Sequence, residues 1–149
     1  MKTEIMPEAG RQDREDRLVF VYGTLRRGGC NDINRSMPAP VFLGTTRIAG
    51  WLFDLGPYPG LLLAHAGEQA PVDVLGEVYA VSPTVEQQLD VLEEIHGQPD
   101  DEYVRRHVSV NVGGQSCICL VYEINPQRVL GRPLINHGDW IRHVDVLSA

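Results

Sequence analysis

The residues Tyr22-Gly-Thr-Leu-Arg26 form a run that could hold an anion. They follow the apolar stretch 18–22, which predicts a buried strand. Because the strand breaks at Gly23, the next backbone N–H groups have no partner strand, and successive free amides suit a carboxylate or an oxyanion. Glycine also lets a ligand approach the backbone closely. The run lacks the ending of a nucleotide-binding P-loop, and taken alone a structural turn is its more ordinary interpretation.

A helix is predicted over residues 82–96. Ser82 is a favourable N-cap residue, and Pro83 suits the first helical position. Gly97 and Pro99 end the pattern. The apolar residues that recur at helical spacing and should face the core are Val85, Leu89, Leu92 and Ile95.

This helix carries the second candidate for chemistry, the carboxylate of Glu93. At about 100° per residue, Glu93 lies on the border of the apolar stripe, where a carboxylate can be half-buried. Burial raises the pKa of a carboxyl group, which suits proton transfer near neutral pH. Glu94 falls nearly opposite the stripe and Asp90 lies further round, so both are expected to face water. Taken alone, Glu93 is more simply interpreted as a surface residue of the helix.

No other group of residues offers a catalytic set. Cys30 has no activating base near it in the sequence, and Cys117 and Cys119 point to one face of a predicted strand as small buried hydrophobes. The three cysteines are expected to be free thiols. The five histidines form no recognised metal-ligand pair.

The elements that must position these residues are mostly strands. Gly44, Gly50 and Gly76 interrupt apolar stretches, which is typical of bulges or tight bends in small barrels. Gly113 and Gly114 predict a hairpin turn. The predicted strands span residues 18–22, 41–55, 61–63, 74–81, 103–112 and 116–124. Many short strands and one clear helix indicate an α+β domain built on a small, partly closed β-barrel.

The composition of the 149 residues excludes some classes of function. A net charge of −7 argues against nucleic acid as a partner, and the pairs Arg26–Arg27 and Arg105–Arg106 are expected on solvated edges or loops. No apolar run is long enough to cross a membrane, and the first residues lack a signal peptide, so a cytoplasmic protein is expected. Residues 1–17 are expected to form a flexible polar arm before a single domain at 18–149.

Four motifs in order carry a family resemblance. They are Tyr22-Gly-Thr-Leu-Arg26, Gly76-Glu-Val-Tyr79, Leu89-Asp-Val-Leu-Glu93 and Tyr103-Val-Arg-Arg106. Together they resemble the gamma-glutamylcyclotransferase-like superfamily, which includes AIG2-like and gamma-glutamylamine cyclotransferase branches. The resemblance runs from about Val19 to Tyr122. Many relatives have glycine where this chain has Glu94, which also makes Glu94 the alternative to Glu93 as the catalytic carboxylate.

The resemblance implies a mixed, partly closed barrel and an enzyme that converts a small-molecule gamma-glutamyl amide into 5-oxoproline and a free amine. The α-amino group of the substrate attacks its own γ-carbonyl carbon, so no enzyme nucleophile, metal or organic cofactor is needed. Glu93 would move the proton. The amides of Gly23, Thr24 and Leu25 would hold the oxyanion and the substrate carboxylate.

Two tyrosines complete the implied site. Tyr22 would shape the pocket wall, and Tyr103 would either offer a hydroxyl contact or pack in the core; Tyr122 is a weaker candidate. The pocket rim, expected at residues 26–34 and 51–60, would select the leaving amine. A non-catalytic binding or interaction module on the same fold is the alternative, since fold does not imply function. The sequence does not define an oligomeric state.

Overall fold

The computed structural model describes residues 16–65, 67–70 and 72–148. They form a six-stranded sheet with the order β3-β2-β4-β1-β6-β5. Neighbouring strands pair antiparallel except β1 and β6, which are parallel, so the sheet is mixed. The strands are β1 (Arg17–Val21), β2 (Val41–Asp54), β3 (Pro59–Leu63), β4 (Val72–Val81), β5 (Tyr103–Val112) and β6 (Gln115–Ile124). The helices are α1 (Pro83–Leu92) and α2 (Trp140–Ser148), with short 3₁₀ turns η1 (Ile33–Arg35) and η2 (Pro126–Arg128).

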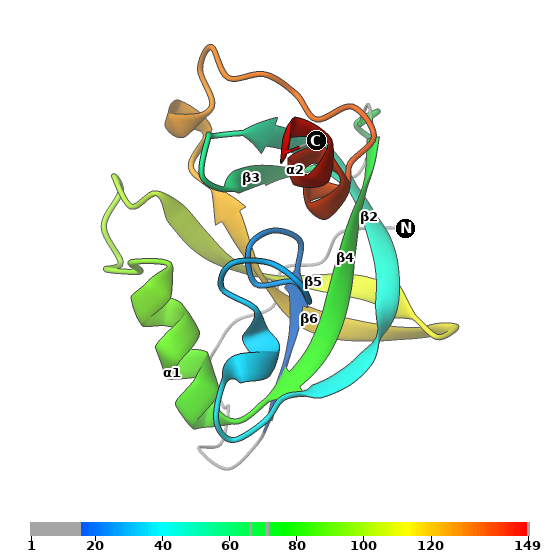
Figure 1. Cartoon of the computed structure of the whole chain (residues 1–149), viewed down its shortest axis with the longest axis vertical. Coiled ribbons are helices and arrows are strands. Elements are labelled where there is room, and N and C mark those ends of the chain that lie inside the picture. The colour runs from blue at the N-terminus through cyan, green and yellow to red at the C-terminus, as the bar shows by residue number, and fades with distance from the viewer. Residues whose placement is uncertain (1–15, 66, 71, 149) are drawn as a thin grey trace.

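The sheet curls into a half-barrel, in which β3 packs against β6 and β2 against β5 (Figure 1). The α+β, partly closed barrel with few helices is therefore confirmed. The prediction of one clear helix missed α2, whose Trp140 is buried in the core. Helix α1 lies beside the 3₁₀ turn of the segment that follows β1 (Figure 1).

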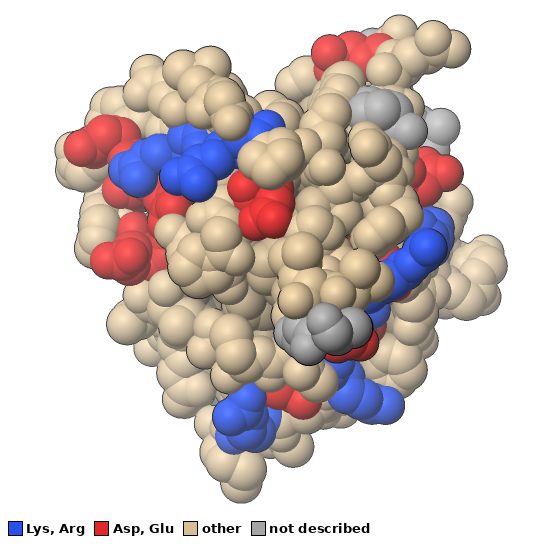
Figure 2. Space-filling model, turned by 45° about the horizontal axis from the view of Figure 1, so that its top comes forward, with Lys and Arg blue, Asp and Glu red and all other residues tan. Residues whose placement is uncertain are grey.

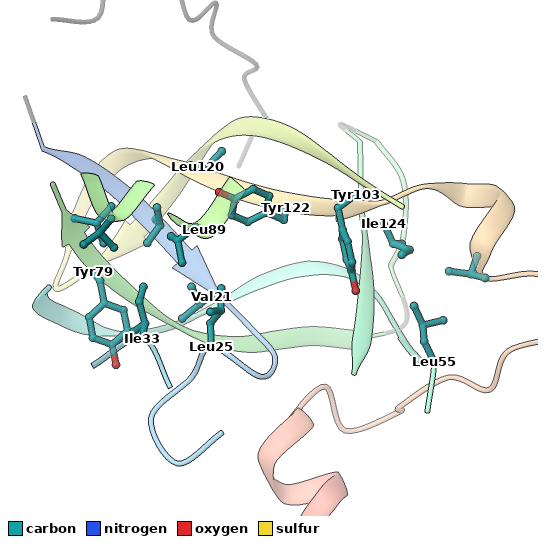
Figure 3. Packing of buried hydrophobic residues seen from close by; sticks show 14 residues of the cluster. Val21, Leu25, Ile33, Leu55, Tyr79, Leu89, Tyr103, Leu120, Tyr122 and Ile124 are labelled. Carbon is teal, nitrogen blue, oxygen red and sulfur yellow. The ribbon is translucent and has the colours of Figure 1, made fainter. Parts of the chain in front are cut away.

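The short strand β1 occupies the centre of the sheet, between β4 and β6. Its last residue, Val21, belongs to a core cluster that also contains Leu25 and Ile33 from the segment after the strand. Figure 3 shows the three side chains close together at the end of the strand. The loop that leaves β1 is thus fixed to the core on both sides of residues 22–24.

Glycine is required at the interior strand positions for different reasons. Gly44 has φ +153° and lies at a register shift in β2, so the expected bulge is confirmed there. Gly50 pairs regularly with Leu63, and a Cβ atom on Gly50 would lie 2.5 Å from the carbonyl oxygen of Leu62. The expected bulge at Gly50 is therefore wrong: a close approach of two backbones, rather than a bend, requires glycine.

Helix α1 begins as expected, with the Ser82 Oγ accepting a hydrogen bond from the amide of Val85 at 3.2 Å. It ends earlier than expected, at Leu92, because Glu94 adopts a left-handed conformation with φ +53°. The amides of Glu94 and Ile95 donate to the carbonyls of Val91 and Asp90, at 3.1 and 3.0 Å. This is the Schellman arrangement that closes a helix. Leu92 was expected to face the core but is 45% exposed.

The boundary of the expected polar arm shifts slightly. Residues 1–15 lie outside the described part of the chain, but Arg17 already opens β1 and pairs with Glu86 at 3.3 Å. In the described residues, neither helix has the length and apolar character that a membrane span requires. On the face shown in Figure 2, basic and acidic side chains are interspersed.

Candidate active site

A cavity of about 120 Å³ lies where the end of β1, the end of α1 and the start of β5 meet. It contains all six residues that the sequence nominated: Tyr22, Gly23, Thr24, Leu25, Glu93 and Tyr103. The other lining residues are Phe20, Val21, Asn31, Tyr58, Pro59, Leu92, Glu94, Glu102 and Tyr122. Asn31 and Tyr58 come from the two segments that were expected to form the rim.

The segment after β1 is a compact loop with unused amides. The carbonyls of Gly23, Thr24 and Leu25 accept hydrogen bonds from the amides of Arg26, Asn31 and Ile33 at 3.1, 3.0 and 2.9 Å. In contrast, within the described residues no acceptor is paired with the amide N–H groups of Gly23, Thr24 and Leu25. Three successive residues that line the cavity therefore have their carbonyls bonded and their donors available.

Gly23 is required here by space. A Cβ atom at this position would lie 2.7 Å from Cγ of Pro59, which opens β3 and also lines the cavity. The carbonyl of Pro59 accepts a 2.6 Å hydrogen bond from the hydroxyl of Tyr103. The loop, the start of β3 and the start of β5 are thus packed directly against one another.

Arg26 is buried, although a solvated position was expected for it. It is 8% exposed, and its guanidinium donates to Glu77 at 2.9 Å and to Asp139 at 2.8 Å. Glu77 also accepts hydrogen bonds from the amide of Arg27 and the hydroxyl of Tyr79, at 2.9 and 2.8 Å. The expectation of a solvated pair is therefore wrong for Arg26, while Arg27 is exposed. The Gly76–Tyr79 motif supplies the carboxylate that holds this loop.

Glu93 caps the C-terminus of α1, and its half-buried side chain lines the cavity. Burial, and after it the charges of Glu102 and Glu94, raise the pKa of Glu93 to about 7. None of the hydrogen bonds within the described residues involves its carboxylate. A carboxylate in this state can both accept and return a proton near neutral pH.

Glu94, the alternative carboxylate, is exposed as expected, although it contributes to the cavity mouth. Its left-handed φ of +53° is a conformation that glycine adopts without steric cost. This geometry gives a physical reason for glycine at this position in relatives: the residue closes the helix.

The tyrosine hydroxyls around the cavity are already used as donors. Tyr22 donates to the carbonyl of Tyr122 at 2.6 Å, and Tyr103 donates to Pro59. Burial is the main cause that raises the pKa of Tyr22 and of Tyr103, so both stay protonated near neutral pH. Tyr103 is thus buried in the core, which was one of the two roles expected of it, and its hydroxyl bonds to the chain segment that confines Gly23.

Asp90 was expected in water but takes part in a network behind the cavity. Its carboxylate accepts hydrogen bonds from Arg105 at 2.6 and 2.7 Å and from the hydroxyl of Tyr122 at 2.7 Å. Arg105 also donates to Glu86 at 2.6 Å, so it is no solvated edge residue. The aspartate of the Leu89–Glu93 motif therefore ties α1 to β5 and β6, one turn before Glu93.

Sequence reasoning missed Glu102 as a lining residue. Its carboxylate accepts a 2.6 Å hydrogen bond from the hydroxyl of Tyr58 at the cavity mouth. Only its position directly before Tyr103 could have indicated it. In the described part of the chain, no group of three or more His, Cys, Asp or Glu side chains is placed to hold a metal ion.

The comparisons with known proteins agree with this fold. A family model described as "Gamma-glutamyl cyclotransferase, AIG2-like" matches residues 19–142. A Vibrio cholerae protein described as "Putative gamma-glutamylcyclotransferase" is 35% identical over 127 residues, which cover 85% of this chain and 97% of that protein. The chain belongs to the AIG2-like gamma-glutamyl cyclotransferase family.

Two solved structures show the same architecture. An AIG2-like protein from Mus musculus is 27% identical with a TM-score of 0.66, over 84% of this chain and 89% of that one. YkqA from Bacillus subtilis is 25% identical with a TM-score of 0.66, over 89% of this chain. The chain spans 42% of the length of YkqA.

Proposed function

We propose that this protein cyclises a small gamma-glutamyl amide to 5-oxoproline and releases the free amine. Its family supports this kind of activity. The observation that carries the proposal is the pairing, in one cavity, of a half-buried carboxylate with a pKa of about 7 and three successive residues with unbonded amides.

The reaction begins with proton removal. Glu93 takes a proton from the α-ammonium group of the substrate, and its raised pKa makes it a stronger base than an ordinary carboxylate. The freed amine attacks the γ-carbonyl carbon, and a new C–N bond closes the five-membered ring. The electrons of the C=O bond move to oxygen, where the amides of residues 23–25 stabilise the negative charge.

The second step breaks the original amide bond. The tetrahedral intermediate collapses, the C=O bond reforms, and the amide C–N bond breaks. The ring nitrogen, which is positively charged after the attack, passes its extra proton to the leaving nitrogen, and Glu93 returns the first proton to the same nitrogen. These two transfers release 5-oxoproline and the protonated amine, and the enzyme is unchanged. Holding the chain folded for ring closure contributes several kcal/mol to catalysis, typically about 7–11 for well-oriented intramolecular reactions.

The test is the Glu93→Gln variant, assayed at pH 8 for 5-oxoproline release from a panel of gamma-glutamyl amines and dipeptides. Loss of general acid–base catalysis lowers turnover by about 10²–10⁴-fold. Glu94→Gln is the matched control and should retain nearly all turnover. Wild-type turnover in Glu93→Gln would contradict the role of Glu93, and a large loss in Glu94→Gln would favour Glu94 instead.

The same panel separates an enzyme from a binding module. A module that only binds gamma-glutamyl ligands would saturate in a titration without releasing amine. Binding is followed through the tyrosine signals of the cavity, and amine release is measured in the same samples.

A further inference from the structure

Arg26 follows the three amides directly, yet its side chain does not line the cavity. It turns away from the amides to Glu77 of β4 and Asp139, the residue before α2. The side chains of Arg26 and Glu77 are each 9% exposed, and that of Asp139 is 18% exposed. One guanidinium thus joins the loop to a central strand and to the last helix.

Both acceptors are themselves held in place. Asp139 Oδ1 also accepts a hydrogen bond from the amide of Arg142 at 3.1 Å, as an N-cap residue of α2 does. Burial alone would raise the pKa of Asp139, but the bonds from Arg26 and Arg142 hold it below its usual value. Glu77 is fixed by the hydroxyl of Tyr79 and the amide of Arg27.

This clamp matters because it adds long-range polar bonds to a loop that the core holds mainly by apolar packing of Leu25 and Ile33. The bonds from the amides of Arg26, Asn31 and Ile33 all arise within the segment that follows β1. The side-chain bonds from Arg26 instead connect residues separated by 51 and 113 positions in the chain. A displacement of about 1 Å in a group that orients a reacting molecule can lower the rate about 10²-fold.

We propose that Arg26 is a positioning residue, which holds the amides of Gly23–Leu25 at their working positions through Glu77 and Asp139. The first turn of α2 is then a support of the active site, although it does not touch the cavity. The proposal rests on the substrate-holding role proposed above for residues 23–25.

The test compares Arg26→Lys and Asp139→Asn with Arg106→Lys. Lysine keeps the charge of Arg26 but cannot reach two carboxylates with a fixed fork. Asparagine at 139 keeps an oxygen for the amide of Arg142 and removes only the charge. Arg106 is the control: its Nε bonds to Glu123 at 3.0 Å, like Arg26 to Glu77 at 2.9 Å, but it lies on β5 and its bond does not involve the loop after β1.

Three quantities are measured well below the melting temperature: kcat and KM, the pH profile, and amide hydrogen exchange of residues 22–29. Arg26→Lys should lower kcat/KM by about 10–100-fold and Asp139→Asn by a smaller factor. The profile should keep its midpoint near pH 7, because Arg26 is not among the causes of the raised pKa of Glu93. Exchange of residues 22–29 should accelerate in both variants and stay unchanged in Arg106→Lys.

The opposite result is equally clear. If kcat/KM and exchange in both variants match those of Arg106→Lys, Arg26 contributes only general stability and the proposal is overturned. Hydrogen exchange needs no turnover, so it decides the proposal even if the wild-type protein releases no product. The absence of product from the whole panel would instead contradict the proposed function.

Discussion

Burial of Glu93 and the negative charge of Glu102 together raise the pKa of Glu93 to about 7. The position of Glu102 is fixed, because its carboxylate accepts the 2.6 Å hydrogen bond from Tyr58. The segments that carry Tyr58 and Glu102 therefore influence the charge state of Glu93, the residue proposed to move the proton. This arrangement makes the pH dependence of the reaction a direct probe of the site.

The first prediction concerns the pH profile. Since only ionised Glu93 can accept a proton, kcat/KM should rise through about pH 7 and level off above it. Replacing Glu102 with Gln removes a neighbouring negative charge, so the midpoint should move to lower pH. Asp73→Asn, at an exposed position on β4, is the control and should leave the profile unchanged. An unmoved midpoint in Glu102→Gln would show that the charge of Glu102 does not contribute to the raised pKa of Glu93.

The second prediction concerns stability. The pKa of Glu93 rises from 4.5 to about 7 on folding, so the folded state binds its proton more tightly. The stability from that proton is present below pH 4.5 and is lost as the pH rises through 7. Glu93→Gln should therefore be more stable than wild type at pH 8. The expected gain in the free energy of unfolding is about 1–3 kcal/mol, because each pKa unit corresponds to about 1.4 kcal/mol and solvent screening reduces the sum.

Denaturant unfolding at pH 4 and at pH 8 checks this second prediction. The gain should shrink toward zero at the lower pH, where both states hold the proton. The same difference at both pH values would mean that the variant acts through packing rather than through the charge.

The third prediction concerns Glu94. For a residue with a side chain, the left-handed conformation raises the free energy of the folded state by about 1–2 kcal/mol. Glycine avoids this strain, but it also makes the unfolded chain more flexible, which offsets part of the gain. Glu94→Gly should therefore be more stable than Glu94→Ala by about 1 kcal/mol. Both variants remove the carboxylate and should lower the midpoint of the pH profile equally. Equal melting temperatures for the two would contradict a left-handed residue at 94.

The fourth prediction concerns the contact between Gly23 and Pro59. A methyl group at residue 23 would lie 2.7 Å from Cγ of Pro59, so Gly23→Ala should destabilise the protein by about 1–3 kcal/mol and reduce turnover. Pro59→Ala removes the ring but keeps the carbonyl that accepts the Tyr103 bond. In a double-mutant cycle, Gly23→Ala should thus cost less in the Pro59→Ala background. Strict additivity would assign the effect of Gly23→Ala to something other than this contact.

Local pattern was enough to place most of the elements. The alternation of residues 103–112 and the Ser82–Pro83 start of α1 both correspond to observed boundaries, because short-range periodicity and capping determine them. The end of α1 was misplaced because a glutamate in a left-handed conformation gives no sequence signal. Helix α2 was missed, although Asp139 is a favourable N-cap residue that could have indicated its start.

In the candidate site, too, some residues could be predicted from local sequence and others could not. Glu93 could be predicted because its place on a helix face follows from residue spacing. The amides of residues 23–25 could be predicted because they follow a strand that breaks at glycine. The burial of Arg26, the bonds of Asp90 and the place of Glu102 depend on partners distant in the chain. Arg26 and Asp139, for example, are separated by 113 positions, and no local pattern connects them.

That separation also has a consequence for how the molecule is made. Residues 23–26 leave the ribosome well before strand β6, which pairs with β1, and before Asp139, which lies 113 positions after Arg26. Such long-range contacts form late in folding because they require closure of large loops. The nascent chain therefore carries the proposed substrate loop long before it carries the supports of that loop, and binding competence should appear only after Asp139 has emerged.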